Sequence, residues 1–248
     1  AREIARGHGF HTKFIRPYAW QQMIASGKNV APTQMPDTYQ PPVQPFIWSV
    51  VFKALEKYSA YEPATGSAMY LLDRVIGCLG AFWFLLTIGL THFTIRRLFD
   101  DKIALFTSLI LILCQPLWEV AVSGSPQALV MLWTAVAFWC FAHALQKSEA
   151  EVSHWLPLAG VSIACGLMAL THLMALWIVT GFLVASAMLM KRRSASVLFV
   201  ASIPLLCLIG WCMRNYLLCG DALGAAKATF QSLLVYGGDE PLQRDFIL

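Results

Sequence analysis

Long apolar stretches occupy most of the chain from residue 75 to residue 217. A helix needs about 20 apolar residues, within a range of about 17–25, to cross the hydrocarbon core of a bilayer. We therefore expect an all-α fold: a polytopic transmembrane helical protein of about six spans, in a transmembrane domain at residues 69–217. The expected spans are 75–95, 103–118, 126–146, 155–171, 173–190 and 195–217.

The boundary between the fourth and fifth spans rests on length. Residues 155–190 are apolar enough to read as one helix. Such a helix would rise about 54 Å, and the hydrocarbon core is only about 30 Å thick. We place the boundary at Thr171 and His172 for this reason.

The composition excludes an ordinary soluble enzyme, a disordered chain and a fibrous repeat. The chain is 58% hydrophobic and 13% charged, whereas soluble domains carry about 25% charged residues. The net charge of +4 comes without a basic stripe with interleaved aromatics, so we expect no nucleic-acid partner. The seven cysteines form no CxxC pair, and His8 and His11 have no evident third ligand. We therefore expect no metal and no cofactor, and a divalent metal stays an open alternative.

Residues 1–68 are more polar, and we expect them to form a large loop on one side of the membrane. Within this loop, residues 43–58 place apolar side chains on one helical stripe. A helix of this kind lies in the membrane interface rather than spanning it. The expected stripe contains Val43, Phe46, Ile47, Val50, Val51, Ala54, Leu55 and Tyr58, and the polar face contains Gln44, Ser49, Lys53, Glu56 and Lys57.

Basic residues set the expected orientation. Lys and Arg concentrate in alternate short loops, which the positive-inside rule places in the cytoplasm. The loop at 1–68, the turn at 123–125, His172 and a segment at 218–248 then lie outside the cytoplasm. We expect 218–248 to be truncated, and a further helix to precede Ala1. The basic residues are Arg96, Arg97, Lys102, Lys147, Lys191, Arg192 and Arg193.

Polar residues at the outer ends of the expected spans are the candidate functional residues. Arg74, His172 and Arg214 would gather positive charge on one membrane face, where a lipid phosphate is the natural ligand. The alternative is that the two arginines only reach lipid headgroups, and that His172 is a structural turn residue. Glu119 could act as a general base or accept a sugar hydroxyl, or it could be a solvated cap.

Several motifs resemble, in order and over nearly the whole chain, the polytopic GT-C glycosyltransferases of glycosyltransferase family 39. This family includes the protein O-mannosyltransferases and the lipid A aminoarabinose transferases. The resemblance is to the N-proximal portion of such enzymes, without the first helix. The motifs are AREIARGHGF, YQPPVQPFIWSVVFKAL, DRVIGCLGAFWFLL, RRLFDDKIALFTSLILILCQPL, GLMALTHLMAL and IPLLCLIGWCMRNYLLCGDALG.

The resemblance implies a fold, a reaction and a location. The enzyme would transfer a sugar from a polyprenyl-phosphate donor to a protein, lipid or glycan on the extracytoplasmic side, as an integral protein of the bacterial inner membrane. Arg74, His172 and Arg214 would bind the donor phosphate. The donor and acceptor loop would include Tyr39, Gln40, Pro41, Glu119 and Asn215. The catalytic acid of the family would lie upstream of Ala1.

The chain departs from the family pattern at three positions. His172 stands where members have Lys or Arg, Gln40 where some have Lys, and Gln127 where an acid is common. The alternative is a non-catalytic GT-C-derived membrane subunit that acts as a scaffold in a larger complex. Its partners would be membrane lipids and other membrane subunits. A transporter ranks last, because the charged residues lie at span ends.

Overall fold

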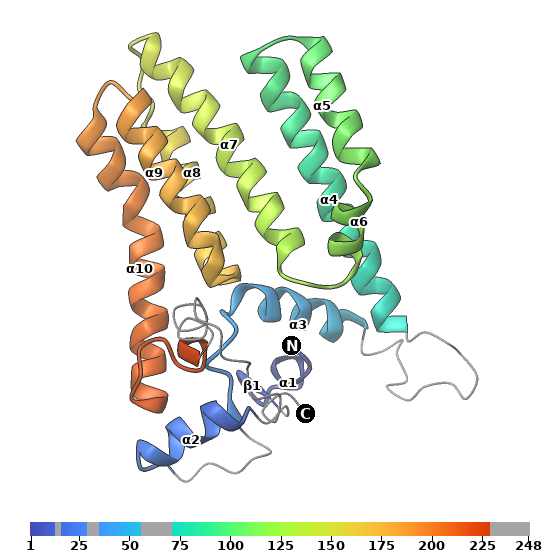
Figure 1. The fold of residues 1–248 in the computed structure, drawn as a ribbon, viewed down its shortest axis with the longest axis vertical. Coiled ribbons are helices and arrows are strands. Elements are labelled where there is room, and N and C mark those ends of the chain that lie inside the picture. Colours follow the sequence, from blue (N-terminus) through green and yellow to red (C-terminus); the bar gives the residue numbers. More distant parts are fainter. Residues whose placement is uncertain (13–15, 29–34, 56–70, 229–248) are drawn as a thin grey trace, which may run out of the picture. The chain divides into compact units, whose positions relative to one another are not determined.

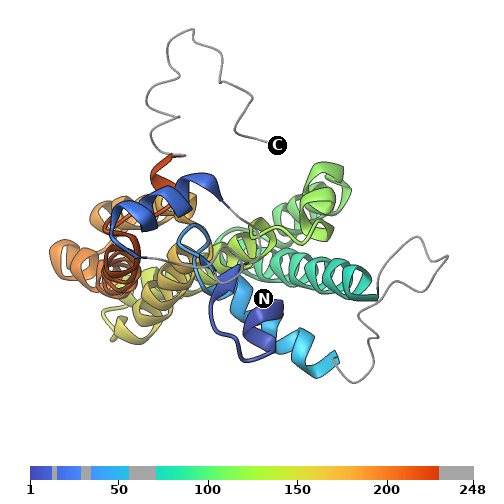
Figure 2. The same ribbon diagram turned by 90° about the horizontal axis from the view of Figure 1, so that it is seen from below.

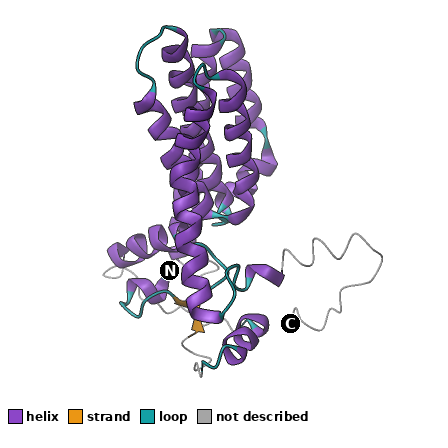
Figure 3. Cartoon of the chain, turned by 90° about the vertical axis from the view of Figure 1, so that its left-hand side faces the viewer, coloured by secondary structure: helices purple, strands orange, loops and turns teal. Residues whose placement is uncertain are grey.

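The computed structural model describes residues 1–12, 16–28, 35–55 and 71–228. The described residues are mostly helical (Figure 3). Two strands of two residues each, β1 (His11–Thr12) and β2 (Met35–Pro36), form an antiparallel pair. The chain divides into two compact units. Unit 1 combines Ala1–Lys53 with Ile209–Leu248, and unit 2 is Ala54–Leu208. The first and last parts of the chain, which the sequence analysis treated separately, thus belong to one unit.

Unit 1 is built from short elements and the end of a long helix. Besides β1 and β2, it contains α1 (Arg2–Ala5), α2 (Pro17–Ala25), most of α3 (Val43–Leu55) and the last turns of α10 (Arg193–Cys219). Helix α2 begins at Pro17. Proline suits this position because the first N–H groups of a helix have no partner within the helix. The buried core of unit 1 joins its two chain segments, with Ala19, Met23 and Met35 from the first, Cys219 and Ala225 from the second, and Tyr39 packed against them.

Helix α3 covers most of the helix expected at 43–58, and residues 56–58 lie outside the described residues. Phe46 and Val50 of the expected apolar stripe are 60% and 57% exposed. Gln44 and Ser49, expected on the solvated face, are instead buried. For Ser49 the physical reason is local, because its hydroxyl donates to the Phe46 carbonyl oxygen over 2.6 Å and needs no water.

Unit 2 is a bundle of consecutive helices (Figure 1). They are α4 (Leu71–Leu98), α5 (Asp101–Leu113), α6 (Gln115–Val122), α7 (Gln127–Glu149), α8 (Trp155–Thr171), the 3-10 turn η2 (Leu173–Ala175), α9 (Leu176–Leu189) and the first part of α10. Helices α7 and α8 lie side by side, as Figures 1 and 2 both show. The larger core includes Phe141, Met168, Phe182 and Val200, contributed by α7, α8, α9 and α10.

The basic turns of unit 2 lie at one end of the bundle. The α4–α5, α7–α8 and α9–α10 connections are together at that end (Figure 1). Side chains link them, since Lys191 pairs with Glu151 at 3.0 Å and Arg97 donates to Gln146. The turns at 123–126 and 172 lie at the opposite end. The connections rich in Lys and Arg and the turns without them thus lie at opposite ends of the bundle, as the charge pattern predicts.

Among the described residues, three helices are long and apolar enough to cross a membrane: Leu72–Leu98, Gln127–Glu149 and Arg193–Cys219. The pair α5 and α6 would make a fourth, bent by 62° at its break. Pro116 follows the break, and a proline cannot donate to the preceding turn. Helix α8 has 17 residues and rises about 25 Å, less than a core of about 30 Å. The expected count of six spans is therefore not confirmed.

Small residues bring the helices of unit 2 close together. A Cβ on Gly80 of α4 would lie 2.0 Å from the Ala121 carbonyl oxygen of α6, and one on Gly160 would lie 2.6 Å from the Cys140 sulfur. Apolar side chains cover the outside, including Leu156 at 81% exposed and Trp177 at 78% exposed. Small residues inside and large apolar residues outside are typical of a bundle in lipid.

Candidate functional site

Arg214 lies in the last turns of α10, within unit 1. Its Nη1 donates to the Asp37 carbonyl oxygen over 2.9 Å and to Asn215 Oδ1 over 3.2 Å. Its Cζ lies 5.0 Å from the centre of the Phe10 ring and 4.9 Å from that of Trp211. The guanidinium is therefore held by two aromatic faces and a backbone carbonyl. Both hydrogen bonds use Nη1, which leaves the hydrogens of Nε and Nη2 without a hydrogen-bond partner among the described residues.

The segment around Asp37 meets Arg214 from the other side. Asp37 Oδ1 accepts the backbone N–H groups of Tyr39 and Gln40 at 2.9 Å and 3.2 Å. This short-range pattern, in which an aspartate caps the following residues, fixes a turn. The turn gives Tyr39 and Gln40 a defined backbone shape, and Pro41 directly after it is buried.

Asn215 ties the same segment to α10. Its side chain is fully buried, and Nδ2 donates to the Thr38 carbonyl oxygen over 3.4 Å. Thr38 is also buried and accepts the Ala225 backbone N–H at its hydroxyl over 3.4 Å. The structure thus brings four of the candidate residues, Tyr39, Gln40, Arg214 and Asn215, to one place.

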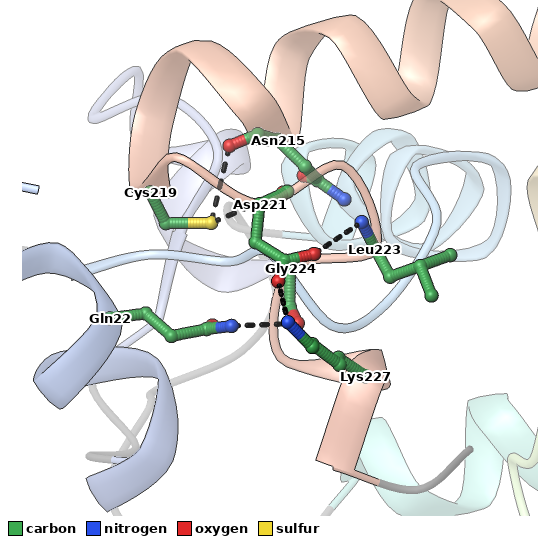
Figure 4. Close-up of polar contacts among 7 residues, drawn as sticks. All are labelled: Gln22, Asn215, Cys219, Asp221, Leu223, Gly224 and Lys227. Carbon is green, nitrogen blue, oxygen red and sulfur yellow. Dashed lines mark hydrogen bonds and ion pairs between the residues drawn. The ribbon is translucent and has the colours of Figure 1, made fainter. Parts of the chain in front are cut away.

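The turn after α10 completes this arrangement (Figure 4). Gln22 Nε2 donates to the Gly224 carbonyl oxygen over 3.3 Å, and Asp221 pairs with Lys227 over 2.6 Å. The hydrogen bond from Lys227 to Asp221 raises the pKa of the lysine. Gly224 has a φ of +57°, and a Cβ there would lie 2.6 Å from the Thr38 carbonyl oxygen. Only glycine allows so close an approach with this backbone conformation.

Arg16 is a second basic residue at this site that sequence reasoning missed. Its Cζ lies 4.0 Å from the centre of the Tyr39 ring. Its Nε is buried without a hydrogen-bond partner among the described residues. Arg16 stands in a polar stretch with no apolar span beside it, so it lacks the signal that marks a charge at the end of a span. Phe10 was missed as well, because cation–π pairs leave no local spacing pattern.

The other candidate residues belong to unit 2. Arg74, in the first turn of α4, is exposed, and its side chain makes no hydrogen bond or ion pair within the described part of the chain. Glu119 of α6 is exposed and accepts from Gln115 Nε2 over 2.7 Å, a pair one helical turn apart. Among the described residues, no second element holds either side chain in a fixed geometry.

His172 connects α8 to the 3-10 turn η2. Its Nδ1 accepts the Met174 backbone N–H over 3.2 Å, which caps the turn. Burial lowers the pKa of His172 and so favours the neutral imidazole. Since Nδ1 must be unprotonated to accept, the proton of the neutral ring sits on Nε2. This geometry gives His172 a structural part in the turn.

The chemistry that unit 1 offers is cationic. Its described carboxylates are Glu3, Asp37 and Asp221, and each is engaged: Glu3 by His8, Asp37 by the turn and Asp221 by Lys227. No group of three or more metal-ligating side chains occurs in residues 1–12, 16–28, 35–55 and 71–228. Arg16 and Arg214 keep donors that have no partner among the described residues, and such donors are suited to an anion.

Comparisons with known proteins give one match. No curated protein and no solved structure matches the chain. Residues 64–223 match a family described as a domain of unknown function, DUF8201. The match covers more than half of the chain, including all of α4 to α9 and α10. The chain therefore belongs to the DUF8201 family.

Proposed function

We propose that the chain is a membrane glycosyltransferase, or a portion of one, with the GT-C architecture. It transfers a sugar from a polyprenyl-phosphate donor to a protein, lipid or glycan acceptor on the extracytoplasmic side. The observation that carries this proposal is the gathering of Arg16 and Arg214 on the segment from Asp37 to Gln40. The resemblance assigns Arg214 to the donor phosphate, and it assigns Tyr39, Gln40 and Asn215 to the donor and acceptor loop.

The arginines supply the expected recognition of phosphate. A guanidinium presents N–H donors in a planar fork that matches the oxygens of a phosphate group. Arg214 keeps Nε and Nη2 for this purpose while Nη1 anchors the side chain to Asp37 and Asn215. When the sugar leaves, the polyprenyl phosphate gains negative charge. Preoriented donors stabilise that charge more in the transition state than in the bound donor.

The membrane arrangement in this proposal has six spans, with the basic turns in the cytoplasm of a bacterial inner membrane. Helices α8 and α9 would cross as short spans, which a bilayer accommodates by local thinning. Exposed apolar residues on both support this placement, among them Ile163 at 50% and Met188 at 68%. Membrane lipids are then direct partners of the bundle.

A scaffold is the second candidate function, and one observation favours it. Every described carboxylate of unit 1 already makes a structural hydrogen bond. A general base needs a carboxylate within reach of the acceptor hydroxyl, and these three groups are committed elsewhere. In this alternative the chain is a GT-C-derived subunit, and its partners are other membrane proteins of a larger complex.

The decisive experiment uses the full-length protein in nanodiscs with undecaprenyl phosphate as the probe. We expect binding, measured by native mass spectrometry, to weaken about tenfold in Arg16→Gln, since hydrogen bonds to charged groups contribute about 1.5–3 kcal/mol. Lys53→Gln is the matched control, an exposed cation on α3 of the same unit. Arg74→Gln tests the exposed arginine of unit 2 at little risk to folding.

The outcomes separate the two candidates. Binding that depends on Arg16 but not on Lys53, together with transfer of sugar from a polyprenyl-phosphate donor, supports the transferase. If wild type, Arg16→Gln and Lys53→Gln bind undecaprenyl phosphate equally, the assigned site is rejected. Absence of probe binding, with other membrane proteins retained through purification, supports the scaffold.

A further inference from the structure

A polar pocket lies at the end of unit 2 where the basic turns gather. Its volume is about 410 Å³. It is formed by the end of α7, the α7–α8 turn and the α9–α10 turn, and its polar lining includes Ser148, Glu151, His154, Lys191 and Arg192. A bound water occupies about 30 Å³, so the pocket has room for a molecular group larger than a single water.

Two residues that line this pocket each carry a buried polar atom that has no hydrogen-bond partner in the described part of the chain. The two atoms are Nε2 of His154, a residue 8% exposed, and the hydroxyl of Ser148, a residue 3% exposed. Buried polar atoms of folded proteins nearly always have a partner. Both residues line the same pocket, so a rotation of either side chain toward it would let a ligand with hydrogen-bonding oxygens supply that partner.

The charges of the pocket favour an anion. Lys191 and Arg192 contribute two positive charges, and Glu151 contributes one negative charge. Glu151 is already paired with Lys191 at 3.0 Å, and its side chain is 82% exposed. An exposed ion pair of this kind is weak and is readily exchanged for another anion. The Arg192 side chain makes no hydrogen bond or ion pair among the described residues, so its guanidinium donors are available to a ligand.

Backbone donors add to the side chains. Helix α8 begins at Trp155, and His154 at its N-cap makes no side-chain cap hydrogen bond. The first N–H groups of a helix have no partner within the helix, and they favour negatively charged groups. The N-terminal end of α8 thus offers further backbone N–H donors beside His154, which lines the pocket.

Apolar surface adjoins the pocket at Trp155, which is itself part of the lining. The Trp155 ring packs edge-on against Phe199 of α10, with ring centres 5.4 Å apart. Leu156 and Leu198, on the same two helices, are 81% and 72% exposed. In a membrane these side chains contact acyl chains. A phosphate in the pocket and an acyl chain along α8 and α10 would suit a single lipid molecule.

We propose that this pocket binds a phosphate group through Lys191, Arg192, His154 and Ser148. The group comes either from the headgroup of an anionic lipid or from a soluble phosphate, and the chemistry of recognition is the same for both. Basic pockets between helices at a cytoplasmic membrane face bind anionic headgroups in this way. The lining of the pocket includes neither Arg214 nor Arg16, and the proposal does not depend on the function proposed above.

The test compares charge-matched variants of the full chain in nanodiscs. The variant with both Lys191→Gln and Arg192→Gln removes the two cations that line the pocket. Arg193→Gln removes a cation one residue further on that does not line it. The lipid probe is phosphatidylglycerol in competition with phosphatidylcholine, counted by native mass spectrometry. The soluble probe is orthophosphate against chloride at equal ionic strength, followed by the midpoint of thermal unfolding.

We expect the preference of the double variant for phosphatidylglycerol to fall about 25-fold, because each basic residue near an anionic surface contributes about fivefold. Arg193→Gln should stay close to wild type. If orthophosphate stabilises wild type but not the double variant, and both have the same lipid preference, the site binds a soluble phosphate. Equal behaviour of the double variant and Arg193→Gln toward both probes would overturn the proposal.

Glu151→Gln provides a test that does not require loss of a cation. It releases Lys191 from its ion pair and removes the negative charge that competes with the ligand. We expect the affinity for the occupying probe to rise about threefold, within the range of an exposed ion pair. If the double variant fails to fold, an unchanged or lower affinity in Glu151→Gln rejects the site.

Discussion

The Ser162 hydroxyl of α8 donates a hydrogen bond to the Val200 carbonyl oxygen of α10 over 3.0 Å. In an unbroken helix that carbonyl would accept from the backbone N–H four residues later, but that residue is Pro204, which has none. The same hydroxyl oxygen accepts the Ile203 N–H over 3.3 Å. Lipid offers no substitute partner for backbone groups. One serine on α8 thus satisfies the helix that the proline interrupts.

Replacing Ser162 by alanine should therefore destabilise the bundle. Ser162 is fully buried, so Ser162→Ala leaves the Val200 carbonyl and the Ile203 N–H without their partner. Each unsatisfied buried group costs about 1–3 kcal/mol. We expect a lower free energy of unfolding by about that amount, measured by denaturant titration in mixed micelles.

Ser186 provides the matched control. It is as fully buried as Ser162, but its hydroxyl has no hydrogen-bond partner within the described residues. Ser186→Ala removes a polar group rather than a hydrogen bond, so stability should stay the same or rise. Equal losses in the two variants would show that burial of a serine, and not the repair of α10, accounts for the effect.

Gly80 and Gly77 make a second pair of opposite expectations, on α4. A Cβ on Gly80 would meet the Ala121 carbonyl oxygen at 2.0 Å, whereas one on Gly77 would meet its nearest atom, the Val122 carbonyl oxygen, at 3.6 Å. Gly80→Ala should cost about 1–3 kcal/mol by forcing α6 away. Gly77→Ala should gain about 0.5–1 kcal/mol, because alanine is the better helix former. Thermal unfolding in detergent measures this: the unfolding midpoint should fall in Gly80→Ala and rise in Gly77→Ala.

Much of the bundle was predictable because length and hydropathy are local properties. The apolar run at 75–95 corresponds to α4, Leu71–Leu98, which extends further at both ends. Hydropathy marks only the apolar part of a helix, and charged residues such as Asp73 and Arg97 continue its hydrogen bonding. Helix α8 ends at Thr171, the boundary predicted because one helix over residues 155–190 would be longer than the bilayer core is thick. The length of α9 and the bend at α5–α6 depend on packing and were not predictable in this way.

The candidate site was only partly predictable for a related reason. Arg214 and Asn215 attract notice because they are polar at the end of an apolar run. Their contact with Asp37 and Thr38 joins residues 177 positions apart, and nothing in either local pattern encodes that pairing. Arg16 was missed because its contact with Tyr39 is through the ring face. Long-range partners of a side chain require the fold.

Gly224 and Gly220 test how the turn after α10 is attached to the segment at Thr38. Both have positive φ, +57° and +73°, so alanine at either should cost about 1–2 kcal/mol. At Gly224 the new Cβ would also lie 2.6 Å from the Thr38 carbonyl oxygen, whereas at Gly220 the nearest atom, Ser26 Cβ, is 3.6 Å away. We expect Gly224→Ala to lose more stability and to expose residues 220–228 to protease. Identical protease sensitivity would contradict this attachment.

His172 should make stability fall as the pH is lowered. Burial holds its pKa below the value of about 6.5 in an unfolded chain. Between those two pKa values the unfolded state binds more protons than the folded one, so stability increases with pH there. Protonation would also remove the Nδ1 acceptor from the Met174 N–H. His172→Asn keeps a side-chain acceptor but does not titrate. We expect wild type to lose more stability than His172→Asn between pH 7.5 and 5.5, and parallel pH profiles would show that other histidines account for the effect.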